Sequence, residues 1–204
     1  MHPSRIRAVA LGAALVGWSL VAPRVRWHPG PHAVLGTALV AATGTPLGLR
    51  PPALWSGLRL GLAVATPVLL GVAAATAVPP VHAAMAGRDL PDAAARWLLL
   101  RIPLGTVWAE EAAYRAALGT MAAAAFGPTG GRLLQSVVFG LSHIDDARAT
   151  GEPVVGTVVV TGAAGWLFAL LFERSGSLAA PMLAHLAINE AGAVAALAVQ
   201  RRGR

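Results

Sequence analysis

Ionisable and amide side chains are concentrated in the apolar segments of the C-terminal half of the chain. They are Glu110, Glu111 and Arg115 in one segment, His143 in the following segment, and His185 and Asn189 in the final one. A charged side chain at the centre of a membrane-spanning helix costs about 2.5–3.5 kcal/mol or more, so it indicates a functional site by default. These six residues therefore form the candidate functional site.

The first group contains two carboxylates in different situations. Glu111 and Arg115 are four residues apart with the acid first, an arrangement that favours an ion pair on one helix face. Glu110 lies about 100° away around the helix axis, which leaves it without a local counter-ion. A buried carboxylate of this kind is suited to accept and return a proton, and Tyr114 is a candidate donor to it. The alternative role for Glu110 is a salt bridge between two helices.

The two histidines are each associated with a residue one turn away. His143 follows Phe139 by four residues, and His185 precedes Asn189 by four, so each pair shares a helix face. An imidazole and a carboxamide that present neutral donors to one point are what an oxyanion hole requires; the alternative is a polar clasp between helices. Asp146 is either a partner for His143 or an interfacial residue. The remaining histidines fall in loops or at helix ends and are left out of the candidate site: His2, His28, His32 and His82.

The composition indicates what kind of scaffold positions these residues. Of 204 residues, 56% are hydrophobic and only 12% are charged, with a mean hydropathy of +0.64, whereas soluble domains carry about 25% charged residues. The lipid bilayer is therefore the expected partner. All 16 basic residues are Arg, in short runs without interleaved aromatic residues, and no nucleic-acid partner is expected. The absence of Cys excludes disulfides, thiolate metal sites and a thiol nucleophile.

Apolar segments separated by Pro, Gly and charged residues predict an all-α fold, a polytopic transmembrane helix bundle of about seven spans. The predicted segments are residues 6–22, 32–49, 54–78, 97–126, 132–149, 154–172 and 178–200. We expect residues 1–96 to form N-terminal transmembrane helices without a recognised motif, and residues 97–204 to form the transmembrane core that carries the candidate site. The small size and Arg-only basicity favour a multi-pass protein of the bacterial cytoplasmic (inner) membrane.

Three short motifs on three of these segments resemble those of the CAAX-processing and bacteriocin-processing (CPBP) family of intramembrane glutamic endopeptidases. Residues 110–115 match E-E-x-x-x-R, residues 139–143 match F-x-x-x-H, and residues 185–189 match H-x-x-x-N. Each motif is weak by itself. Their order, and their placement on separate hydrophobic segments over about the last 95 residues, make the resemblance specific.

The resemblance assigns the six polar residues to three pairs. It implies that Glu110 and His143 activate a water molecule. His185 and Asn189 would hold the oxyanion, and Glu111 and Arg115 would support the site. It further implies a peptide or membrane-protein substrate, with no metal and no cofactor.

The predicted function is metal-independent hydrolysis of a peptide bond within or near the membrane. A first alternative is a zinc-dependent membrane protease that uses the same residues, because one carboxylate and two imidazoles are a plausible ligand set; no H-E-x-x-H motif is present. A second alternative is a non-catalytic membrane adaptor or a transporter. The polar groups occupy only one half of the chain and no inverted repeat is visible, which disfavours a transporter. Serine catalysis lacks a G-x-S-x-G motif.

Overall fold

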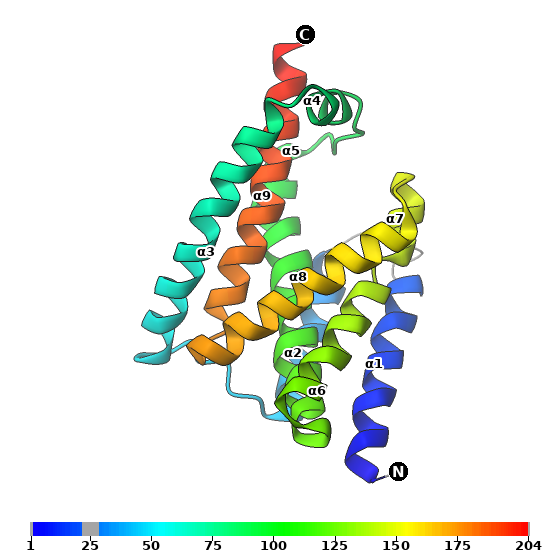
Figure 1. The fold of residues 1–204 in the computed structure, drawn as a ribbon, viewed down its shortest axis with the longest axis vertical. Helices are drawn as coiled ribbons and strands as arrows, with labels where there is room; N and C mark the ends of the chain where they lie inside the picture. Colours follow the sequence, from blue (N-terminus) through cyan, green and yellow to red (C-terminus); the bar gives the residue numbers. More distant parts are fainter. Residues whose placement is uncertain (1, 22–28, 204) are drawn as a thin grey trace.

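The computed structural model describes residues 2–21 and 29–203, and all regular secondary structure among them is helical (Figure 1). The elements in chain order are α1 (Pro3–Val21), α2 (Pro29–Thr43), α3 (Ala53–Thr76), α4 (Pro79–Ala86), α5 (Ala94–Arg96), η2 (Trp97–Trp108), η3 (Glu111–Gly119), α6 (Thr120–Leu141), α7 (Ile144–Thr150), α8 (Val154–Ser175) and α9 (Ala179–Arg202). The predicted all-α class is confirmed. Residue 22, the predicted end of the first segment, and His28 lie outside the described residues.

Four of the described helices, α1, α3, α8 and α9, are long and apolar enough to cross a membrane. Large apolar side chains point outward from the bundle, among them Leu70 and Val155, which are 66% and 77% exposed. A surface of this kind is stable against lipid and unfavourable in water, as expected of an integral membrane protein. The count of seven spans is not confirmed, because α2 has 15 residues and about 20 are needed to cross the hydrocarbon core.

The predicted segment 97–126 is one continuous helical run, but its geometry differs from the α-helix expected from sequence. Wide π-helical turns, with backbone bonds from each residue to the fifth along, occupy η2 and η3. Pro103, which has no backbone N–H to donate, lies inside η2. Ala109 and Glu110 form the α-helical junction between the two wide stretches, so Glu110 lies at a local change of helix geometry.

Within α6 the chain reverses direction at Gly127, whose φ of 77° and ψ of 168° are accessible only to glycine. Residues 128–141 then fold back beside the preceding helical run. The two legs are in close backbone contact, since a Cβ on Gly131 would lie 2.4 Å from the nitrogen of Ala123. One leg carries Glu110 and the other leads to His143. The end predicted for the segment 132–149 is wrong, because α6 ends at Leu141.

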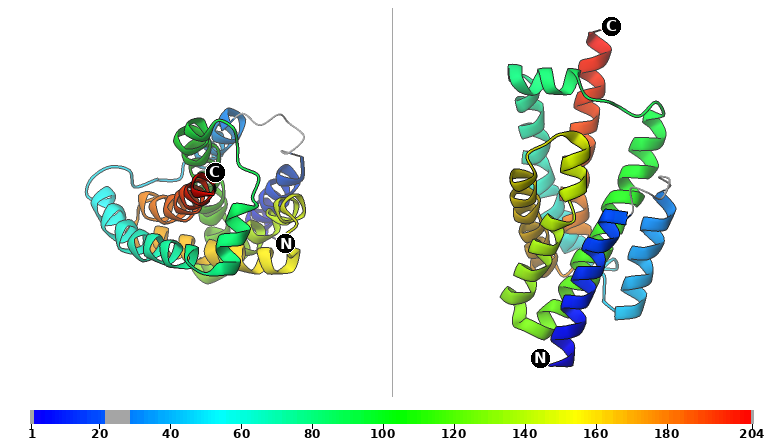
Figure 2. Two further views of the ribbon diagram at one scale, coloured as in Figure 1. Left: turned by 90° about the horizontal axis from the view of Figure 1, so that it is seen from above. Right: turned by 90° about the vertical axis from the view of Figure 1, so that its right-hand side faces the viewer.

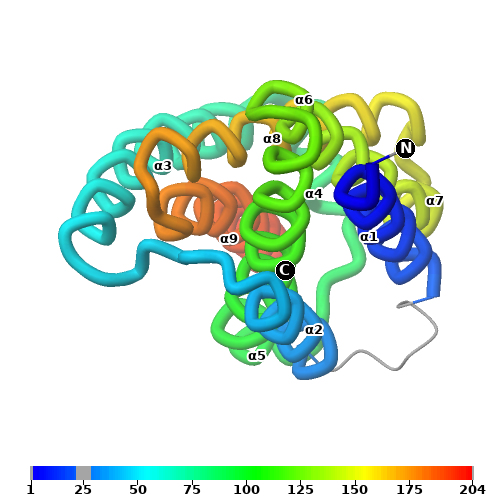
Figure 3. Tube along the Cα trace, turned by 90° about the horizontal axis from the view of Figure 1, so that it is seen from below, coloured from blue at the N-terminus to red at the C-terminus, as the bar shows by residue number. Residues whose placement is uncertain are grey.

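The remaining helices pack around this hairpin. α3 lies along α9, α8 crosses α6 and contacts α9, α1 lies against α6, and α2 covers η2 and η3. In the view from below, α9 lies between α3 and the run 97–126 (Figure 3). The oblique course of α8, and the two ends of the chain at opposite ends of the bundle, are seen in Figures 1 and 2. At the crossing of α6 and α8, a Cβ on Gly140 would lie 2.5 Å from the carbonyl oxygen of Val158, so glycine permits the close approach that places Phe139 and His143.

Candidate active site

Side chains from all three motifs line one cavity of about 620 Å³. The polar motif residues in its wall are Glu110 from the η2–η3 junction, His143 from the turn after α6, and His185 and Asn189 from α9. A cavity of this size is in the range that holds small ligands or a short chain segment. The structure therefore brings together the four residues that the sequence singled out for chemistry.

Glu111 and Arg115 form the predicted ion pair behind this cavity. Arg115 Nη1 lies 3.3 Å from Glu111 Oε1, and both side chains are fully buried. The guanidinium carbon lies 3.8 Å from the centre of the Phe139 ring and 5.0 Å from that of Phe168. Aromatic faces attract a cation electrostatically, so Arg115 is held by one carboxylate and two rings.

A contact that the sequence did not reveal joins Glu111 to the last helix. His185 Nδ1 lies 2.7 Å from Glu111 Oε1. Because an ionised carboxylate can only accept, Nδ1 carries the proton and donates it. The imidazole also stacks on Phe168, with ring centres 5.0 Å apart and planes at 25°. These contacts fix the ring so that Nε2 faces the other carboxylate, 3.8 Å from Glu110 Oε2.

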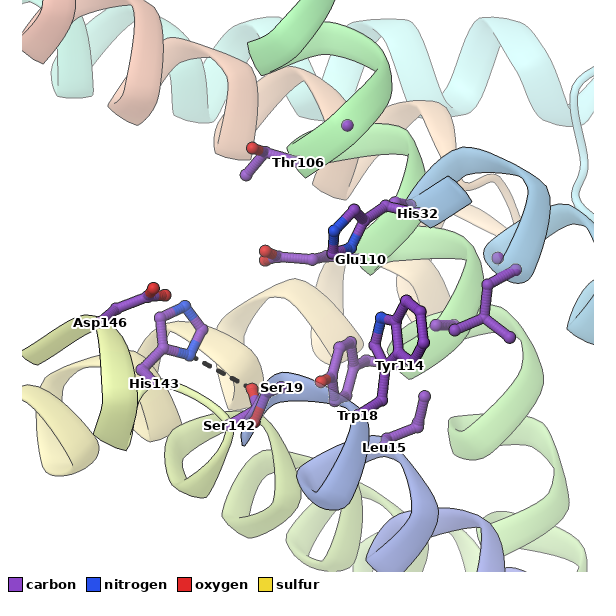
Figure 4. Close-up of a pocket in the computed structure, with 15 residues that line it drawn as sticks. Leu15, Trp18, Ser19, His32, Thr106, Glu110, Tyr114, Ser142, His143 and Asp146 are labelled. Atoms are coloured by element: carbon purple, nitrogen blue, oxygen red, sulfur yellow. Dashed lines mark hydrogen bonds between the residues drawn. The ribbon is translucent and has the colours of Figure 1, made fainter. Parts of the chain in front are cut away.

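Glu110 differs sharply from its neighbour Glu111. Its side chain is 26% exposed, and its Oε2 atom is buried without a hydrogen-bond partner among the described residues. The expected hydrogen bond from Tyr114 is not formed, which corrects the prediction. The Tyr114 ring packs against Phe139 with ring centres 5.1 Å apart, and its hydroxyl is directed toward Ser142, away from the Glu110 carboxylate (Figure 4).

His143 is oriented by the main chain. Its Nδ1 lies 2.7 Å from the carbonyl oxygen of Phe139; a carbonyl only accepts, so Nδ1 carries the proton. In the neutral ring Nε2 is then an acceptor, and it faces Asp146 and Glu110 (Figure 4). Ser142 Oγ is a more distant neighbour of Nδ1, at 3.4 Å. Because Nδ1 donates a hydrogen bond to the backbone carbonyl of Phe139, Asp146 does not orient this ring nitrogen.

The structure revises the expected geometry of the oxyanion donors. Asn189 Nδ2 donates to the carbonyl oxygen of His185, 3.1 Å away on the same helix, and Nδ1 of His185 donates to Glu111. The two side chains do not present all their donors to the cavity, as their spacing had suggested. What remains is the second amide N–H of Asn189 and Nε2 of His185, which donates only when both ring nitrogens are protonated.

The comparison with known families agrees with the three motifs. Residues 92–191 match the family described as type II CAAX prenyl endopeptidase Rce1-like, and all six candidate residues lie within this stretch. Because of this similarity, residues 92–191 are called the CAAX-protease region below. No curated protein and no solved structure matches the chain. The CAAX-protease region begins just before α5 and ends within α9, so α1 to α4 lie outside it.

Residues outside the CAAX-protease region also reach the site. Glu110 and His143 line a second, smaller pocket of about 90 Å³, together with Trp18 and Ser19 of α1 and His32 of α2 (Figure 4). His32 was excluded because it lies at a helix end. It does lie there, at the start of α2, but that helix end faces Glu110 in the folded chain. No motif or spacing marks Trp18, Ser19 or His32, so sequence reasoning had no signal for them.

No group of three or more His, Asp or Glu side chains placed to hold a metal ion is found within residues 2–21 and 29–203. Glu110 and His185 lie near each other, while the second carboxylate beside His185, Glu111, is already paired with Arg115. In the CAAX-protease region, the polar groups are therefore arranged as a chain of paired side chains that ends at Glu110.

Proposed function

We propose that the chain is a glutamic intramembrane endopeptidase that hydrolyses peptide bonds in or near the membrane without a metal, in the cytoplasmic membrane of a bacterium. The observation that carries the proposal is the grouping of Glu110, His143, His185 and Asn189 around one cavity within an apolar helical bundle. The match of residues 92–191 to a membrane-protease family supports it.

Glu110 and His143 activate the water. A water molecule between them loses one proton to the Glu110 carboxylate, which has no competing hydrogen bond at Oε2, and donates a hydrogen bond to His143 Nε2. The resulting hydroxide adds to the carbonyl carbon of the substrate. When the carbon–nitrogen bond breaks, Glu110 returns its proton to the leaving amine. General acid–base catalysis of this kind contributes about 10²–10⁴ in rate.

His185 and Asn189 stabilise the negative charge on the carbonyl oxygen. Asn189 offers its second amide N–H, and His185, held at Nδ1 by Glu111, offers Nε2–H when both ring nitrogens are protonated. Donors fixed before the reaction stabilise developing charge without reorganisation. Arg115 holds Glu111 in place and balances its charge, so the ion pair supports the oxyanion donors without contacting the substrate.

The test is substrate capture with a Glu110→Gln variant in the native host membrane, followed by identification of the copurified protein. Reconstituted wild-type protein should then cleave that substrate, and Glu110→Gln should cleave it at least about 100-fold more slowly. Glu173→Gln is the matched control, since Glu173 pairs with Arg132 at the surface, away from the cavity. Full activity of Glu110→Gln would refute the proposed chemistry. A bound but uncleaved partner of the wild type would favour the adaptor alternative.

A further inference from the structure

We propose that the small pocket beside Glu110 is a water chamber that supplies the nucleophile from the side of α1 and α2. The chamber is defined by Trp18, Ser19, His32, Glu110, Tyr114 and His143. This inference rests on the proposed function for the role of the water. It goes beyond that function because half of these residues lie outside the family-matched stretch 92–191.

Two compartments share the wall that carries the chemistry. Glu110 and His143 line both the 620 Å³ cavity and the 90 Å³ pocket. A peptide segment requires a space of several hundred Å³, so the larger cavity is the one that can admit substrate. The smaller pocket exceeds the roughly 10–15 Å³ needed for one water several-fold. Substrate and water can therefore reach Glu110 from different sides.

Two residues that line the pocket each carry a buried polar atom without a hydrogen-bond partner in the described part of the chain. Trp18 Nε1 and Glu110 Oε2 are both buried, and neither has a hydrogen-bond partner among the described residues. Buried polar atoms are nearly always satisfied by protein or by ordered water. One atom is a donor and the other an acceptor, so water in the chamber accepts from Trp18 and donates to Glu110.

Two further polar residues in the wall, Ser19 and His32, can contact water in the pocket. Ser19 Oγ donates to the carbonyl oxygen of Val16, which leaves its lone pairs able to accept from water. The His32 ring lies edge-on to Trp18, with ring centres 5.7 Å apart, and close to Glu110 (Figure 4). The indole nitrogen of Trp18 is directed toward this same side of the pocket. Polar side chains thus line one part of the space, beside apolar residues such as Leu15 and Leu35, and they offer an internal water the partners it requires.

Radiolytic footprinting tests whether the chamber holds water, because hydroxyl radicals formed from internal water oxidise the side chains beside it. We expect Trp18 of the reconstituted wild-type protein to be oxidised. Ser19→Leu, which fills the pocket, should reduce this labelling to background, whereas the matched Ser19→Ala variant should not. Unchanged labelling of Trp18 in Ser19→Leu, or no labelling in the wild type, would contradict the proposal that the pocket holds water.

Kinetics test whether this water is the nucleophile. Trp18→Phe keeps an aromatic ring, although a smaller one, and removes the indole N–H. We expect kcat to fall about 10-fold or more while KM stays unchanged, since Trp18 does not line the substrate cavity. Trp55→Phe is the control, because Trp55 is 55% exposed on α3. Wild-type kcat in both Trp18→Phe and Ser19→Leu would overturn the supply role. Labelling of Trp18 in a wild-type protein that cleaves nothing would support the water site and refute the proposed function.

Discussion

The imidazole of His185 on α9 donates from Nδ1 to the carboxylate of Glu111 on η3 over 2.7 Å, and the two residues are 74 apart in sequence. This bond joins the first motif to the last. It continues through Glu111 to Arg115, which is enclosed by Phe139 and Phe168. The orientation of His185 is thus determined from behind the cavity.

This relationship predicts the protonation of one ring nitrogen. In protein labelled with ¹⁵N-histidine, the Nδ1 of His185 should be protonated, with the resonance assigned by its loss in His185→Asn. Glu111→Gln should shift this resonance, because an amide oxygen replaces the charged acceptor. Phe139 O binds the equivalent atom of His143, so the His143 signal serves as the internal reference. An unprotonated Nδ1 at His185 would contradict the geometry.

Arg115→Ala should destabilise the protein strongly. The substitution leaves Glu111 as a fully buried charge without its cation, which costs about 3–5 kcal/mol. Arg132→Ala is the control, because its partner Glu173 is partly exposed and surface pairs contribute about 0–1 kcal/mol. Thermal unfolding in detergent measures both. An Arg115→Ala protein as stable as the wild type yet inactive would place Arg115 in the chemistry rather than behind it.

Substitution of Asn189 distinguishes two roles of its side chain, as an oxyanion donor or as a contact within the helix. Asn189→Ala should lower kcat about 10²–10³-fold with little change in KM, and Asn189→Asp should lower it further, because a carboxylate repels the oxyanion. If the bond to the His185 carbonyl is the only role of the side chain, Asn189→Ala should retain its activity and lose less than about 1 kcal/mol of stability. Steady-state cleavage and thermal stability of the same preparations distinguish the two.

Strong chelator should leave cleavage unchanged if Glu110 and His143 activate water by themselves. The measurement is activity after prolonged dialysis against chelator, with the zinc content of the purified protein determined in parallel. Loss of activity to chelator and its recovery with zinc would support the metalloprotease alternative, which uses the same carboxylate and imidazoles.

Gly140→Ala should separate α6 from α8. The added Cβ would meet the Val158 carbonyl at 2.5 Å, and backbone shifts of this kind typically cost about 1–3 kcal/mol. His143 follows three residues later, so activity should fall together with thermal stability. Gly71→Ala is the control, since a Cβ there meets nothing within 4 Å. Equal stability of the two variants would show that α6 and α8 have room to adjust.

Spacing along the chain predicted the contacts made within one helical run. The Glu111–Arg115 pair forms as expected, even though the turns of η3 are wider than α-helical ones. The three motifs also meet at one cavity. Spacing could not predict which donors the fold would use, because the bond from His185 to Glu111 depends on how α9 packs.

The contribution of the N-terminal helices could not be predicted for a different reason. Trp18 and His32 occupy apolar segments in which nothing distinguishes them from packing residues, and only the docking of α1 and α2 places them beside Glu110. The sequence reads as two separate apolar segments, and the reversal at Gly127 joins them as the two legs of a hairpin. A glycine followed by a proline marks a break, but the direction of the chain after it depends on tertiary packing.

The buried Arg115 has a consequence for the order of biosynthesis. Its carboxylate partner is four residues earlier on the same helical run, so the two charges neutralise each other as soon as that run forms, and the hairpin can enter the bilayer before the later helices are made. His185 is on α9, the last described helix in chain order. The buried charges of Glu111 and Arg115 are therefore paired early in synthesis. The site is complete only when α9 has packed against the earlier helices. A chain that still lacks α9 therefore lacks His185 and Asn189 in the wall of the cavity.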